Sequence, residues 1–244
     1  SNLDKEKVTE FINIIKKDGI IKNFILDGLI ISKLDNILDD REIDLLAELG
    51  EIFELKNEEI SDLSEFACGI LENSENRINE LLKKSDFLML NDISSYISDT
   101  FSIILTQKNL SKDTFITGNC TIDTKIENKG KIKIENAKIT FGENGMLESL
   151  KGTEIEIINS EIINGEFNFT NAEKVIIEKC IFNNSERKNT LKFEMCEDAK
   201  VTECAFNNCG RGIYINLSNV QMNKLRFDNC GHKDKDNNNE WDGG

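Results

Sequence analysis

The fold is decided by a sequence motif that occurs twice, as AKVTECAFNNCG at 199–210 and as VQMNKLRFDNCG at 220–231. A shorter copy, VIIEKCIFNN, stands at 175–184. Within each copy apolar residues alternate with polar ones, which is typical of β-strands. The copies begin 24 and 21 residues apart, and a period in this range is typical of solenoids. The copies of the motif therefore predict stacked repeats that are built from strands.

The same motif extends through the second half of the chain in the general form apolar-x-apolar-x-x-small-x-apolar. Its six segments are Phe115/Thr117/Cys120/Ile122, Ile132/Ile134/Ala137/Ile139, Ile155/Ile157/Ser160/Ile162, Val175/Ile177/Cys180/Phe182, Ala199/Val201/Cys204/Phe206 and Val220/Met222/Leu225/Phe227. A parallel β-helix needs such a spacing, because each coil must return one rung higher and present the same positions inward. Leucine-rich repeats have a similar period but need leucines at fixed places, which this sequence lacks.

A second strand in each coil is indicated by the pairs Phe167/Phe169, Leu191/Phe193 and Ile213/Ile215. An asparagine column lies between the two strands, at Asn164, Asn184, Asn208 and Asn229. Stacked asparagines form side-chain hydrogen bonds with the matching asparagines of neighbouring coils, and asparagine also tolerates the left-handed backbone that a sharp bend requires. With these columns, residues 113–232 resemble the right-handed parallel β-helix of the pectate-lyase-like superfamily. The resemblance implies about six coils.

The first half of the chain has the helical period instead, with apolar residues three and four apart. We expect helices at 4–17, 20–34, 40–55, 57–83 and 86–108. The predicted fold class is therefore an α+β multidomain protein. It has a helical bundle at 1–112 and a β-helix at 113–244 that ends in a polar, looped or disordered segment.

The helical half carries a second resemblance, in DNILDDREIDLLAELGEIFELKNEEI at 35–60. This run is similar to the helical domain of tellurite-resistance B-type (TerB) proteins. The resemblance implies a cytoplasmic, stress-related module that binds a divalent metal or a partner through acids, with Asp35, Asp39 and Glu42 as the transferable candidates. The alternative is that these acids cap helices and keep one helix face soluble.

The overall charge excludes some partners. The 244 residues include 45 acidic and 30 basic side chains, for a net charge of −15. Nucleic acids and anionic membranes are bound by clustered lysine and arginine, so neither is an expected partner. The chain also has no proline, which suits a sheet in which every coil donates its backbone N–H groups to the next.

The seven cysteines lack the CxxC spacing of metal and redox sites. We expect Cys120, Cys180 and Cys204 to share one small interior column with Ala137 and Ser160. Cys209 and Cys230 are expected to be neighbours in adjacent coils, either as packed thiols or as a disulfide or metal pair. An odd number of cysteines favours free thiols in a reducing cytoplasm.

Catalytic signals are sparse in the second half. Sugar-cleaving β-helices use paired acids, or an Arg or Lys base beside calcium-binding acids. The outward columns show mixed charges, and the polar candidates are Asp198, Glu203, Arg211 and Arg226. The single histidine, His232, disfavours histidine-based triads.

We therefore expect a non-enzymatic interaction scaffold with a protein or carbohydrate partner. The alternatives are a carbohydrate-active enzyme, either a polysaccharide lyase or a hydrolase, and a metal-binding helical module. Nothing in the sequence covers the C-terminal end of the solenoid, and exposed strand edges invite pairing. This predicts either a native chain that continues past Gly244 or an end-to-end homodimer.

Overall fold

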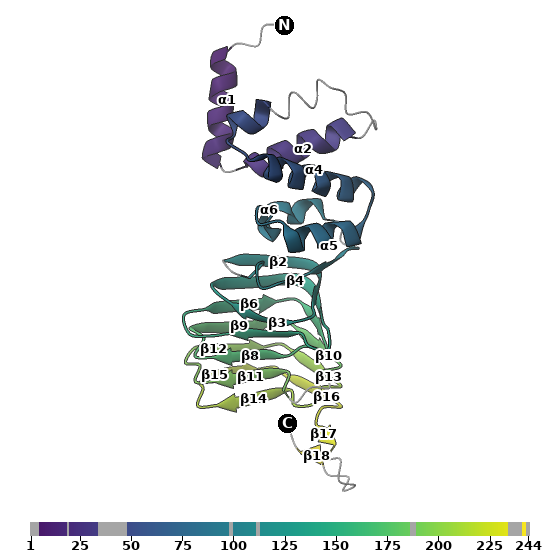
Figure 1. Cartoon of the computed structure of the whole chain (residues 1–244). Coiled ribbons are helices and arrows are strands. Elements are labelled where there is room, and N and C mark those ends of the chain that lie inside the picture. The colour runs from purple at the N-terminus through teal and green to yellow at the C-terminus, as the bar shows by residue number, and fades with distance from the viewer. Residues whose placement is uncertain are drawn as a thin grey trace. The chain divides into compact units, whose positions relative to one another are not determined.

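The computed structural model describes residues 5–18, 20–33, 48–97, 100–110, 113–185, 189–233 and 241–242. The chain divides into two compact units between Ile97 and Ser98. Helices form the first unit, and a parallel β-solenoid of about six turns forms the second (Figure 1). The predicted α+β fold class is confirmed.

The helical unit has an apolar core to which several of its helices contribute buried side chains. Its elements are α1 (Lys5–Asp18), α2 (Ile21–Lys33), α4 (Asn57–Leu71), α5 (Glu75–Lys84), α6 (Leu90–Ile93) and the 3-10 helix η1 (Ser94–Tyr96). Residues 48–52 are also helical. Leu26 and Leu29 of α2 and Leu63 and Phe66 of α4 are fully buried.

Two of the predicted helices are wrong. The helix expected at 57–83 is divided into α4 and α5, because Asn73 adopts a left-handed conformation (φ 51°) and Ser74 caps the next helix through Arg77 N–H. The helix expected at 86–108 gives way to α6, η1 and a strand. In that strand Ile103 is buried, and Leu105, just beyond it, is buried too.

The solenoid is built from short strands that pair in parallel with the coils before and after them. They are β1 (Ser102–Ile104), β2 (Thr114–Ile122), β3 (Lys125–Asn128), β4 (Lys131–Phe141), β5 (Met146–Ser149), β6 (Glu154–Ile158), β7 (Glu161–Ile163), β8 (Phe167–Thr170), β9 (Lys174–Glu178), β10 (Ile181–Asn183), β11 (Leu191–Glu194), β12 (Ala199–Thr202), β13 (Ala205–Asn207), β14 (Ile213–Asn216), β15 (Val220–Asn223) and β16 (Arg226–Asp228). The hairpin of β17 (His232–Lys233) and β18 (Trp241–Asp242) forms a separate two-stranded sheet.

The inward columns from the second coil onward are confirmed. They are Ile132/Ile155/Val175/Ala199/Val220, Ile134/Ile157/Ile177/Val201/Met222 and Ile139/Ile162/Phe182/Phe206/Phe227. The second strand of each coil also pairs as predicted, with Phe167, Leu191 and Ile213 in one column.

The predicted register of the first coil is wrong. The observed pairs between β2 and β4 are Thr114/Ile132, Ile116/Ile134, Gly118/Ala137, Cys120/Ile139 and Ile122/Phe141. Cys120 therefore lies outside the small column of Ala137, and the side chains of Phe115 and Thr117 are exposed. The cause is a one-residue register shift in the middle of β2, where the corner is shorter than in later coils.

The coils turn at corners where one residue has a left-handed backbone. The predicted asparagine column makes one such set of corners, with φ between 52° and 55° at Asn164, Asn184, Asn208 and Asn229. Asn229 Nδ2 donates to Asn208 Oδ1 at 2.7 Å, and Asn208 Nδ2 donates to Asn184 Oδ1 at 3.3 Å. Asn164 Nδ2 instead donates to the backbone oxygen of Phe141 at 3.1 Å.

Another set of corners gives the first testable prediction. It contains Asn171, Met195 and Leu217, and Leu217 has φ 50° with 81% of its surface exposed. A left-handed backbone costs a branched residue about 1–2 kcal/mol, whereas asparagine adopts it readily. Leu217→Asn removes this backbone penalty and, because the leucine side chain is exposed, loses no buried contact. We therefore expect the variant to raise the free energy of unfolding by about 1 kcal/mol in urea denaturation.

Leu217→Ala is the control, since alanine removes the same exposed side chain but keeps the left-handed penalty. A Leu217→Asn variant that is no more stable than Leu217→Ala would contradict this interpretation of the corner.

Candidate functional site

The interior of the later coils is a stack of phenylalanine rings. Phe182 and Phe206 stack with centroids 4.8 Å apart and planes 6° apart, and Phe206 and Phe227 stack at 4.9 Å and 11°. Phe182 and Phe206 are fully buried, whereas 46% of Phe227 is exposed. The stack therefore ends at an open face on the last coil.

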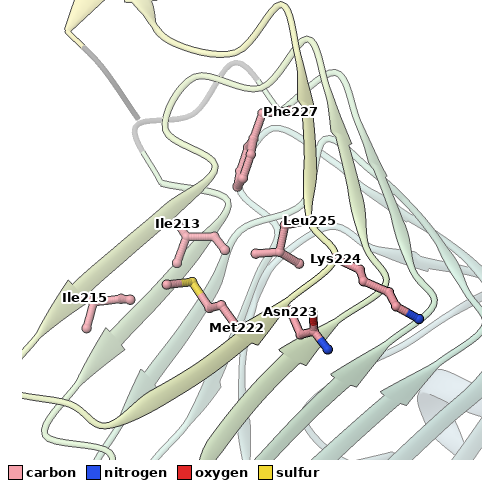
Figure 2. A pocket seen from close by; sticks show the side chains of 7 residues that line it. All are labelled: Ile213, Ile215, Met222, Asn223, Lys224, Leu225 and Phe227. Carbon is pink, nitrogen blue, oxygen red and sulfur yellow. The ribbon is translucent and has the colours of Figure 1, made fainter.

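That face is hollow and apolar. A cavity of about 380 Å³ is lined by Ile213, Ile215, Met222, Asn223, Lys224, Leu225 and Phe227. Figure 2 shows Ile213, Met222, Leu225 and Phe227 around one open space, with the ammonium group of Lys224 directed away from it. The lining comes from β14, β15, β16 and the corner between the last two, so all of it belongs to the final coil.

These side chains occupy core positions of the repeat. Met222 pairs in register with Val201, which is fully buried, yet 51% of Met222 is exposed. The difference arises because β14, β15 and β16 each have a strand neighbour on one side only among the described residues. Core-type side chains on an open coil form an apolar surface of the kind that marks interaction sites.

Lys224 is the one basic residue of the lining, and it is held by the preceding coil. Its ammonium group donates to a carboxylate oxygen of Glu203 at 2.8 Å. This hydrogen bond raises the pKa of Lys224 and lowers the pKa of Glu203. Because the ammonium group of Lys224 is bound to Glu203 and directed out of the hollow, the lining is mainly apolar.

The four polar candidates of the sequence do not form a shared site. Glu203 is paired with Lys224, and Arg226 is paired with Asp228 at 2.9 Å. Asp198 is exposed in the turn before β12, and Arg211 is half-buried in the turn before β14. Within the described ranges no ion pair joins any two of these four residues, so the structure shows no convergent acids or acid–base pair there.

Five of the seven cysteines lie at the corners of the coils, just beyond a strand: Cys180, Cys196, Cys204, Cys209 and Cys230. Cys120 lies within β2, and Cys68 lies in α4. The thiol of Cys180 donates to the backbone oxygen of Ile157 at 3.3 Å, and that of Cys230 donates to the backbone oxygen of Phe206 at 3.2 Å. The contact with Cys204, together with burial, raises the pKa of Cys180. Burial alone raises the pKa of Cys120 to about 12. The raised pKa values keep the buried thiols of Cys120 and Cys180 neutral and unreactive at physiological pH.

This environment predicts the thiol chemistry of the chain. All seven cysteines are free; five are buried, while Cys68 and Cys230 are half-buried. We expect Cys68 and Cys230 to react with a disulfide reagent at pH 8 before the buried five, which should react only after unfolding. Rapid reaction of all seven cysteines in the native protein would contradict the buried positions.

The predicted metal ligands Asp35, Asp39 and Glu42 lie outside the described residues. Among the residues that are described, no group of three or more His, Cys, Asp or Glu side chains is placed to hold a metal ion. Metal binding by the helical half stays a prediction. The melting temperature with calcium or zinc tests it, because a ligand that binds only the folded state raises that temperature.

The repeat pattern predicts Met222, Leu225 and Phe227 in the interior and not on a surface. Their place in the last repeat is the one feature of the sequence that sets them apart. The resemblance of residues 35–60 to TerB proteins is not supported by any match and also stays a prediction.

None of the described helices has both the length and the apolar character needed to cross a membrane. No curated protein and no solved structure matches the chain. A family model described as the right handed beta helix region matches residues 103–238, which is more than half of the sequence. The match covers the coils, the phenylalanine stack and the open final turn, and the chain therefore belongs to the right-handed β-helix family.

Proposed function

We propose that the chain is a non-enzymatic interaction protein whose β-helix is a rigid scaffold and whose final coil is the binding face. The observation that carries this proposal is the hollow of about 380 Å³ lined by core-type side chains of the last coil. Burial of apolar surface is the main favourable term in protein association, and this surface is already exposed.

The rest of the solenoid supports a role as a scaffold. Inner strands such as β10 and β11 are paired on both sides, which fixes the coils relative to one another. Charges on the wall are matched between coils, as in Lys131–Glu154 and Lys174–Glu156, both at 2.8 Å. Exposed pairs of this kind add little stability, but they leave a wall of compensated charge beside the apolar end.

The carbohydrate-active alternative lacks a comparable observation. Hydrolysis needs two carboxyl groups placed across a sugar bond, and elimination needs a base beside bound cations. Several acids of the described solenoid, among them Glu154, Glu156 and Glu203, are paired with lysines.

The proposal predicts where an apolar probe binds. The fluorescence of 8-anilinonaphthalene-1-sulfonate rises on apolar surface, so the native chain at low concentration is expected to enhance it. Met222→Lys places a charge in the hollow, and we expect it to lower the enhancement by about half or more.

Ile181→Lys is the matched control, because Ile181 is 46% exposed on β10, away from the lining of the hollow. Both variants must keep the circular dichroism spectrum of the native chain. Equal fluorescence from the native chain and Met222→Lys would contradict a binding face on the final coil.

The proposal also includes a partner-binding role for the helical unit and a location in the cytoplasm. Resemblance to TerB proteins supports a stress-related partner module in the first unit. The free thiols support a reducing compartment such as the cytoplasm, because chains in oxidising compartments tend to form disulfides.

A further inference from the structure

The backbone of β16 has one residue with its hydrogen-bonding groups directed at the open edge. Arg226 N–H donates to the Cys204 oxygen at 3.0 Å, and the Asp228 oxygen accepts from Asn208 N–H at 2.9 Å, so both residues bond to the preceding coil. Successive residues of a strand direct their N–H and C=O groups to opposite sides. Those of Phe227 therefore face the edge that has no strand neighbour among the described residues.

This arrangement is self-complementary. In an antiparallel ladder, two residues directly opposite each other can exchange both N–H···O bonds. If Phe227 lies opposite Phe227 of a second copy, a twofold axis passes between them and both of these bonds form. Arg226 of each copy then lies directly opposite Asp228 of the other.

The side chains fit the same register. Arg226 and Asp228 point outward and already form an ion pair within one chain, so two copies would bring four alternating charges together. The ring of Phe227 continues the inner stack, and its partly exposed face would meet the same face of the second ring. The two hollows would close each other, as in an isologous interface.

We propose that two copies of this chain bind end to end through β16, in the antiparallel register that pairs Phe227 with Phe227. This inference rests on the proposed binding face and names its occupant. Strands β17 and β18 do not extend the sheet at this edge, because they pair with each other in a sheet of their own and not with β16.

Charge reversal tests the register. Asp228→Arg would place arginine opposite arginine across the axis, and Arg226→Asp would place aspartate opposite aspartate. We expect each variant to raise the dimer dissociation constant about tenfold or more in sedimentation equilibrium, because like charges in an interface repel. An equimolar mixture of the two variants is expected to dimerise again, since both arginines of one copy then face aspartates of the other.

Glu194→Lys is the matched control. Lys192-Phe193-Glu194 on β11 repeats the basic–Phe–acidic order, and Lys192 and Glu194 lie 3.0 Å apart, but β11 is paired on both sides by β8 and β14. We expect this variant to dimerise like the native chain.

The outcomes separate the two proposals. A native chain that is monomeric at every concentration, yet still loses dye fluorescence through Met222→Lys, would overturn the dimer and keep the binding face. A dimer that is indifferent to both reversals would overturn this register. A monomer whose dye fluorescence is unaffected by Met222→Lys would overturn both proposals.

Discussion

Phe206→Ala is expected to lower the free energy of unfolding by about 3–5 kcal/mol, the usual cost of removing a buried phenylalanine. Phe206 is fully buried, with ring neighbours on both sides at 4.8 and 4.9 Å. Its removal leaves a cavity in the stack and breaks two aromatic contacts. Urea denaturation followed by circular dichroism measures the loss.

Phe115→Ala is the control for Phe206, because Phe115 is 43% exposed on β2. We expect it to cost about 1 kcal/mol or less, as is usual for surface substitutions. Equal losses in the two variants would show that the inner stack contributes no special stability.

The second large effect is expected from a proline on an inner strand. Ile181 N–H donates to the Ser160 oxygen at 3.0 Å, and β10 is paired on both sides. Ile181→Pro removes this donor and leaves a carbonyl group without its partner, so we expect a loss of about 3 kcal/mol. Thermal and urea unfolding both measure it.

Since the Ile181 side chain points outward, the variant tests the backbone and not the core. Ile181→Lys keeps the N–H group and is expected to cost less than about 1 kcal/mol. A proline variant as stable as the lysine variant would contradict the idea that the absence of proline reflects the demands of the ladder.

The repeat could be predicted from the sequence because the same positions of each coil are buried, and these positions therefore stay apolar. From Ile132 onward each inward column holds residues that are mostly apolar and 20 to 24 positions apart, and the structure pairs them in the predicted register. The first coil was mispredicted because its corner is one residue shorter, so Cys120 pairs with Ile139. An alignment by spacing has no means of detecting such a deletion when alternate positions stay apolar.

The segment after residue 86 was mispredicted for a related reason. In SIILTQKNL at 102–110 the apolar residues fit a helical as well as a strand period, and pairing with β2 decides between them. Strand formation here depends on a neighbour that the local sequence does not contain.

The candidate site was hidden for a different reason. Met222 and Phe227 carry the same pattern as the buried Val201 and Phe206 one coil earlier. Whether such residues are core or surface depends on what lies against them, which is a property of the assembled solenoid and not of the repeat.

Hydrogen exchange of the final coil tests the central claim most directly. Residues 220–228 contain the outward amide of Phe227, and 199–207 contain the matching strands one coil earlier. At low chain concentration we predict rapid exchange at Phe227 and slow exchange at Phe206, with Phe227 becoming protected as the concentration rises. Protection of Phe227 equal to that of Phe206 at every concentration would mean that the final coil is already covered, and would contradict an open binding face.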